Sequence, residues 1–184
     1  SYGSGTGDTQ NALFQPSTSP NLRAHPSVVA DAETNPSTGE IDARVREKTR
    51  SVSFREFQGV GSDIGFDIYR SLDAPVAIIT NEELILLRAE ANIGLGDLGA
   101  AEDDINFIRT EVAELPEKDV SSMTQAGALD ALLYEKRYSL LMEGGHRWLD
   151  LRRYGLIERL PLDAESHVRN TQFPIPINEQ LARE

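Results

Sequence analysis

The chain has 184 residues and no cysteine, and its 30 acidic residues outnumber its 18 basic residues, giving a formal net charge of −12. The length suits one domain with a sizeable core. The lack of cysteine excludes disulfide scaffolds and Cys-ligated zinc sites. The acid excess argues against nucleic-acid binding, which depends on Lys and Arg displacing counterions from phosphates. No apolar run reaches the roughly 18 residues that a membrane-spanning helix needs.

The first 40 residues predict long loops, because Gly, Pro, Ser, Thr and Asn make up 22 of them. We interpret residues 1–40 as a loop-rich segment that packs on a missing N-terminal portion, and residues 41–184 as a helical region. The chain begins at Ser1 and not at Met, so we expect a processed or truncated product. A carbohydrate site needs flat aromatic faces and planar polar side chains. The candidates in these loops are Tyr2, Phe14, Asn21 and Arg23, each with an ordinary loop or packing role as the alternative.

Two short strands are expected next, because apolar residues occupy alternate positions in 52–54 and 64–68. Four aromatic residues fall in or near these segments, and strand propensity favours their burial. They are Phe54, Phe57, Phe66 and Tyr69.

A capping box at residues 80–83 predicts a helix that begins after Thr80 and runs to about Ile93, where Gly94 and Gly96 end it. The following segment has apolar residues spaced three and four apart, which places them on one helical stripe closed by Pro116. The stripe consists of Leu98, Ala101, Ile105, Ile108, Val112 and Leu115.

A third helix is expected from a second capping box at Ser122 to the glycines at 144–145, and a short fourth helix over about 147–154. The prolines of the remaining tail predict an extended course over the surface. Within the first helix pair, Ala89, Gly96, Asp97 and Ala101 have the spacing of a tetratricopeptide repeat. The predicted fold is therefore mainly α, with tetratricopeptide-like antiparallel helix pairs, long loops and a few short β-strands.

The run from Tyr134 to Gly155 resembles the C-terminal signature of the SusD/RagB family, which reads ER, then EL, then EG-x-R-W-x-DLRR-x-G. Four further segments resemble family motifs in the expected order, at residues 42–44, 83–91, 105–109 and 173–179. The pattern departs from the family at Ala43, at Ser139 and at the additional glycine before His146. The motif positions that we carry over as structural are Asp42, Arg44, Arg137, Glu143, Arg147, Trp148, Asp150 and Arg152.

The resemblance implies the C-terminal portion of a surface-exposed outer-membrane lipoprotein, anchored through an N-terminal Cys that this chain lacks. Such a protein is not an enzyme and needs no cofactor. It binds a glycan or other oligomeric nutrient and delivers it to a SusC-like TonB-dependent transporter. Two alternatives remain open: a repeat-type scaffold that binds a protein or peptide, and a glycoside hydrolase with paired carboxylates.

The corner between the third and fourth helices has two interpretations. In the first, Glu143 and Asp150 form ion pairs with the arginines at 137, 147, 152 or 153, and Trp148 anchors the core. In the second, Glu143 and His146 are metal ligands, although two glycines separate them and a metal site needs further ligands on other helices. We favour the first.

Overall fold

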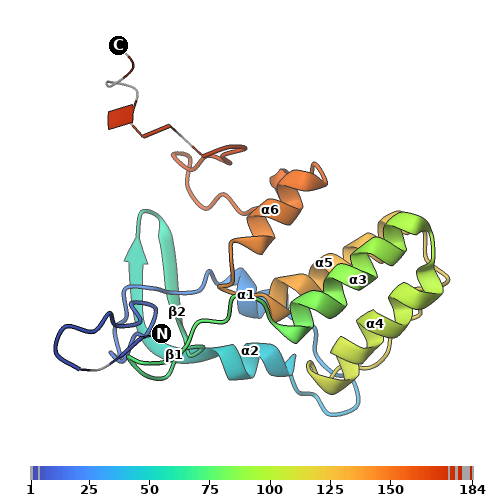
Figure 1. Ribbon diagram of the computed structural model, residues 1–184, viewed down its shortest axis with the longest axis horizontal. Helices are drawn as coiled ribbons and strands as arrows, with labels where there is room; N and C mark the ends of the chain where they lie inside the picture. Colours follow the sequence, from blue (N-terminus) through green and yellow to red (C-terminus); the bar gives the residue numbers. More distant parts are fainter. Residues whose placement is uncertain (1, 4, 174, 177, 180–182, 184) are drawn as a thin grey trace.

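The computed structural model describes residues 2–3, 5–173, 175–176, 178–179 and 183. The chain is mainly α, as predicted, and Figure 1 shows a helical layer with a two-stranded hairpin standing beside it. The elements follow in the order α1 Ser27–Ala30, α2 Ala43–Lys48, β1 Thr49–Phe57, β2 Val60–Phe66, α3 Asn81–Leu95, α4 Leu98–Glu111, α5 Gln125–Ser139, α6 His146–Arg153 and a 3-10 turn at Ile157–Arg159.

Helices α3 and α4 form the predicted helix pair. Helix α3 begins where the capping box places it, since the Thr80 hydroxyl accepts a hydrogen bond from the Glu83 amide at 3.3 Å. It ends at Gly96, whose φ of 80° is the left-handed conformation that glycine adopts without strain. The small residues Ala89 and Ala101 are both fully buried between the helices. The sequence therefore predicted this pair correctly.

The main core lies between α3, α4 and α5. Helix α4 ends at Glu111, so Val112 and Leu115 follow the helix and do not extend it. The chain turns there because Glu114 adopts a φ of 56°, and the turn directs the Leu115 amide to the carbonyl of Arg109 at 2.8 Å. The buried members of the core are Leu86, Ala89, Ile93, Ala101, Ile105, Ile108, Val120, Ala128, Ala131 and Leu132.

Helix α5 differs from the prediction at both ends. Its N-cap is Thr124, which accepts a hydrogen bond from the Gly127 amide, whereas the Ser122 hydroxyl donates to the carbonyl of Asp119. Its last helical residue is Ser139, and the Lys48 ammonium binds the carbonyls of Tyr138 and Ser139 there. A cation at a helix C-terminus compensates the unpaired carbonyls and the helix dipole.

Strands β1 and β2 form an antiparallel hairpin that is longer than predicted, with a two-residue turn at Gln58 and Gly59. Both turn residues have positive φ, the combination typical of tight hairpins. The register shifts between Ser51 and Arg55, which marks a bulge in β1. The prediction that Phe54 and Phe57 are buried was wrong: they are 69% and 67% exposed. That prediction relied on strand propensity, but β1 is exposed from Ser53 to Phe57, so neither ring reaches a core.

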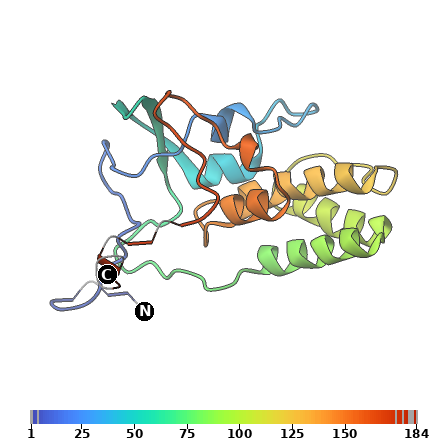
Figure 2. The ribbon, with the colours of Figure 1, turned by 90° about the horizontal axis from the view of Figure 1, so that it is seen from above.

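The N-terminal segment and the tail both pack on other parts of the chain. Ala24 and Val28 join Val45 and Tyr138 in a second, smaller core cluster. The tail has no regular element between residues 160 and 170 and crosses beside α6 and the hairpin (Figure 2). Of the motif at 173–179, Pro174 and Ile177 lie outside the described residues. No helix among the described residues is long and apolar enough to cross a membrane.

The two glycines at the end of α3 give a paired stability prediction. No atom lies within 4 Å of a Cβ built on either residue, so only backbone conformation decides the effect of alanine. We expect Gly96→Ala to lower the free energy of unfolding by about 1 kcal/mol, because φ is positive there. Gly94→Ala, inside the helix, should raise it by about 0.5–1 kcal/mol. Urea unfolding of both variants checks this, and two changes of the same sign would contradict it.

Candidate functional site

A buried ionic centre lies where α2, α4 and α5 meet. Arg44 is 1% exposed and forms two hydrogen bonds with the carboxylate of Asp42, at 2.6 and 3.0 Å. Its other nitrogen lies 2.8 Å from Glu135, which is fully buried. Burial lowers the pKa of Arg44, but hydrogen bonding and the charges of Asp42 and Glu135 outweigh it and raise the pKa overall. Burial raises the pKa of Glu135, and the charges of Arg44 and Arg109 oppose that rise.

Arg109 extends the same centre to the N-terminal segment. One guanidinium nitrogen lies 2.8 Å from Glu135 and the other 2.7 Å from Glu33. Lys118 also contacts Glu33, at 2.7 Å. Burial opposes the ionisation of Glu33, yet hydrogen bonds from Arg109 and Lys118 hold its pKa below the ordinary value. Glu135 thus lies between two arginines. The sequence did not predict that Glu135 and Arg109 would join the motif residues Asp42 and Arg44 in one centre.

A second ionic group joins α3, α5 and α6 around Lys136, which is 4% exposed. Its ammonium lies 2.7 Å from Asp150 and 2.8 Å from Glu90. Glu90 also accepts hydrogen bonds from Arg153 at 2.7 Å and Tyr154 at 2.6 Å. The predicted pairing of Asp150 with an arginine was therefore wrong. The spacing of residues around Asp150 did not indicate Lys136 as its partner, because Lys136 lies on the preceding helix, α5.

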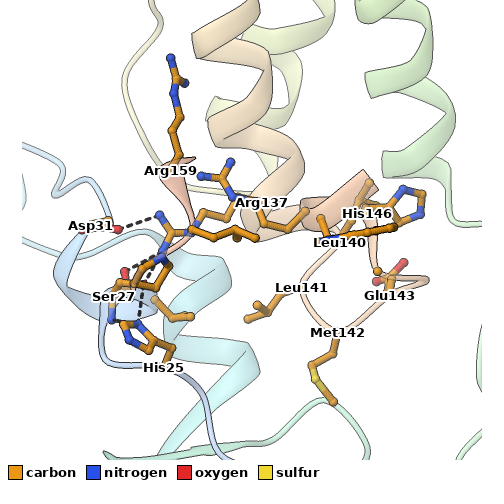
Figure 3. Close-up of a pocket in the computed structure, with 16 residues that line it drawn as sticks. His25, Ser27, Asp31, Arg137, Leu140, Leu141, Met142, Glu143, His146 and Arg159 are labelled. Atoms are coloured by element: carbon orange, nitrogen blue, oxygen red, sulfur yellow. Dashed lines mark hydrogen bonds and ion pairs between the residues drawn. The ribbon is translucent and has the colours of Figure 1, made fainter. Parts of the chain in front are cut away.

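The corner between α5 and α6 borders a pocket of about 580 Å³ with a largely apolar lining (Figure 3). Figure 3 shows Arg137 directed toward Asp31 and Ser27, and its guanidinium lies 2.8 Å from Asp31. Arg137 therefore joins α5 to the N-terminal segment and not to the carboxylates of the corner.

The remaining corner residues are partly buried. Burial raises the pKa of Glu143, Lys48 opposes that rise, and Glu82 and Glu83 reinforce it. His146 lies 3.4 Å from Glu83. Arg147 lines the pocket, where burial and then the charges of Arg137 and Arg159 lower its pKa. No ion pair joins Glu143 to an arginine among the described residues, which corrects the predicted pairing.

Trp148 does not anchor the core. The residue is only half-buried, and its indole nitrogen donates to the carbonyl of Asn170 at 2.8 Å. Its ring packs against Phe173 at a centroid distance of 4.9 Å, and the Arg152 guanidinium lies 5.2 Å from its centre. The indole holds the tail against α6, so the prediction of a core anchor is wrong.

Another pocket, of about 480 Å³, lies beside the hairpin, and we call it the hairpin pocket. It contains two of the four predicted ligand residues, Asn21 and Arg23. Tyr2 and Phe14 are half-buried elsewhere and do not line it. The described residues that line it are Asn21, Arg23, Ala24, His25, Arg55, Phe57, Gln58, Val60, Ser62 and His167.

Rigid contacts hold the polar lining of the hairpin pocket in place. The Arg23 guanidinium donates to the carbonyls of Ser53 at 2.6 Å and Ser62 at 3.0 Å, which joins the N-terminal loop to the hairpin. Arg55 donates to the Asn21 side-chain oxygen at 3.2 Å. The exposed ring of Phe57 completes the site, which combines a flat apolar face with planar hydrogen-bonding groups.

No group of three or more His, Cys, Asp or Glu residues in the described part of the chain has the geometry of a metal site. Glu143 and His146, the residues of the alternative metal interpretation, line the corner pocket without such a group around them.

Comparison with known proteins decides the family. The model of the SusD family matches residues 81–179, more than half of the chain. The chain belongs to the SusD family. A search of the curated proteins finds no match. Among solved structures, a SusD superfamily protein from Bacteroides vulgatus ATCC 8482 superposes with a TM-score of 0.53 at 22% sequence identity. The alignment covers 69% of this chain and 32% of that protein, so the chain spans about a third of its length.

SusD-family proteins are generally non-catalytic binding proteins that bind glycans and work with SusC-like transporters. The family match covers α3 to α6, the part of the chain that contains the corner and the second ionic group. The hairpin pocket lies outside the matched residues except for His167.

The buried ionic centre of this SusD-family protein gives a stability prediction. Glu135→Gln keeps the side-chain shape but leaves two buried arginines short of negative charge, so we expect the free energy of unfolding to fall by about 3–5 kcal/mol. Asp130→Asn removes the exposed partner of Arg159 and should change the free energy of unfolding by less than about 1 kcal/mol. Denaturant unfolding measures both. Equal effects of the two substitutions would show that the buried centre contributes no more to stability than a surface ion pair.

The second ionic group gives a pH prediction. Burial disfavours the ionised form of Glu90, but hydrogen bonds from Lys136, Tyr154 and Arg153 lower its pKa overall from the ordinary value of 4.5. The stability that this contributes is present above about pH 4.5 and is lost as the pH falls through the folded-state pKa. Glu90→Gln should therefore be less stable than the native protein near pH 7, with a difference that shrinks toward about pH 3.

Unfolding curves over this pH range check the prediction, with exposed Glu117→Gln as the control. A difference between Glu90→Gln and the native protein that stays constant with pH would rule out a role for Glu90 ionisation.

Proposed function

We propose that this protein binds a glycan or other oligomeric nutrient without catalysis at the outer-membrane surface and delivers it to a SusC-like TonB-dependent transporter. The family's general behaviour supports this proposal. The observation that carries it in this chain is the hairpin pocket, where an exposed aromatic ring stands beside planar polar side chains. We include a lipid anchor and surface exposure in the proposal on the strength of family membership.

The hairpin pocket has the chemistry that a sugar requires. The ring of Phe57 is 67% exposed, so its face is available to the apolar C–H surface of a pyranose. Asn21 and Gln58 carry amides that donate and accept hydrogen bonds, which suits neighbouring hydroxyl groups. The guanidinium of Arg23 is already fixed by backbone carbonyls, so binding would cost little ordering of that side chain.

A hydrolase is the less favoured alternative, because glycosidases place two carboxylic acids on either side of the scissile bond. The described residues that line the hairpin pocket include no Asp or Glu. A glycan held there would meet no acid and base pair from the residues that line the pocket. This favours capture over cleavage.

A protein-binding scaffold is the other alternative. Helix α3 exposes Leu84, Leu87 and Leu95, which are 54%, 43% and 83% exposed. An apolar helix face of this kind suits contact with another polypeptide. It does not conflict with glycan binding, because the hairpin pocket is built from different elements.

The two exposed phenylalanines of β1 provide a matched test of the proposal. Phe57 lines the pocket, whereas Phe54 is equally exposed and packs over Gly61 outside the lining. We expect Phe57→Ala to weaken oligosaccharide binding roughly 10-fold, equivalent to about 1.4 kcal/mol, through loss of the stacking face. Phe54→Ala should leave the affinity unchanged.

Calorimetric titration of the full chain with a panel of neutral and acidic oligosaccharides measures the affinities, and chromatography of the mixtures monitors turnover. Binding without cleavage supports the proposal. Hydrolysis of a bound oligosaccharide would favour the enzyme, and binding of peptides but no oligosaccharide would favour the scaffold.

A further inference from the structure

The charge of the hairpin pocket is opposite to that of the chain. The protein carries a net charge of −12. Among the residues that the structure describes, the ionisable ones that line this pocket are nevertheless two arginines and two histidines, with no carboxylate. Such a local excess of positive charge in an acidic protein requires an explanation.

The two arginines differ from most others in the chain by lacking an acidic partner. Carboxylates lie within 4 Å of Arg44, Arg46, Arg50, Arg70, Arg88, Arg109, Arg137, Arg153, Arg159 and Arg183. Among the described residues, neither Arg23 nor Arg55 forms such a pair. Arg23 donates to two carbonyls and to the Ser19 hydroxyl, and Arg55 donates to the amide oxygen of Asn21. Neutral acceptors orient both groups and leave their charge uncompensated.

Both histidines of the pocket are already engaged by other groups of the protein. His25 lies 3.1 Å from the carboxylate of Asp163, which does not line the pocket. The Asp163 amide donates to Nδ1 of His167 at 3.3 Å, and Nε2 of the same ring lies 2.8 Å from the carbonyl of Gln58. The positive charge available to a ligand comes from Arg23 and Arg55.

A guanidinium without a carboxylate partner offers a planar set of donors that matches an anionic oxygen pair. Of the two arginines, Arg55 is exposed, and only one of its nitrogens is engaged with the described residues. Arg23 lies deeper and adds to the positive potential. Phe57, two residues after Arg55 on the same strand, supplies a sugar-stacking face in the same pocket. A charged group on a sugar that stacks on Phe57 would therefore lie near Arg55.

We infer that the hairpin pocket selects acidic sugars, with the anionic group of one residue bound by Arg55 and its ring stacked on Phe57. This rests on the proposed glycan binding and adds the class of glycan. The anionic group is a carboxylate, as in a uronic acid, or a sulfate ester. Both present oxygens in the geometry that a guanidinium binds.

The test compares matched oligosaccharides that differ only in charge. Oligogalacturonides and glucuronate-containing oligosaccharides are titrated against the full chain beside their own methyl esters, and sulfated oligosaccharides beside their desulfated forms. We expect the charged member of at least one pair to bind about 10-fold more tightly, as a charge-assisted hydrogen bond provides. The advantage should decrease as salt is raised. The pair that responds identifies the anionic group.

Two variants test whether Arg55 is the source of the preference for charged sugars. Arg55→Gln keeps a planar hydrogen-bonding side chain without the charge, and should bring the charged and neutral members to equal affinity. Arg70→Gln, which neutralises an exposed arginine outside the pocket, is the matched control and should retain the preference. Equal binding of charged and neutral members by the native protein overturns the inference but leaves the proposed function intact. Binding of no oligosaccharide overturns the proposed function itself. A preference that survives Arg55→Gln places the anion elsewhere and also overturns the inference.

Discussion

The pairing of Glu135 with Arg44 and Arg109 is the interaction on which the rest of the structure depends. It joins three helices that are far apart in sequence, and Glu33 adds the N-terminal segment to the same centre. Buried charges are costly to desolvate, and only well-placed partners offset the cost. A shift of any one helix would leave an unpaired charge in the core. The centre therefore restricts α2, α4 and α5 to one relative arrangement, and the second ionic group places α6 against the same helices.

Local signals in the sequence predicted the helix pair well. The Thr80 cap, the left-handed Gly96 and the apolar stripe from Leu98 to Ile108 all operate within one or two helical turns, so no distant contact is needed to recognise them. The end of α5 and the partners of Asp150 were predicted wrongly because both depend on lysines from elsewhere in the chain. Lys48 binds the last carbonyls of α5, and Lys136 approaches Asp150 from the preceding helix.

The candidate site was only half predictable for the same reason. Asn21 and Arg23 stood out as polar residues in a loop-rich segment, but Phe57 lies in a strand-like segment where propensity favours burial, and no pattern in the sequence marked Arg55. The end of β1 is instead exposed at successive residues, which leaves Phe57 open to solvent beside the loop. His167 comes from the tail and reaches the hairpin turn through a single hydrogen bond. The pocket is assembled from a loop, a bulged strand and the tail. Because these segments are far apart in the sequence, no regular spacing of residues indicates the pocket.

The acid excess of the chain does not argue against an anion site at the hairpin. Most of the excess lies in residues 51–150, and its densest part covers α3, α4 and the segment that follows, which Figure 1 shows on the opposite side of the molecule from the hairpin. Charges in solvent are screened over about 8 Å at physiological ionic strength, so those acids have little effect on a ligand at the hairpin. The electrostatic potential at the ligand is therefore determined by the nearest charged groups, Arg23 and Arg55. The net charge therefore excludes an extended polyanion lying across the helices, and it leaves room for one charged sugar held at the hairpin.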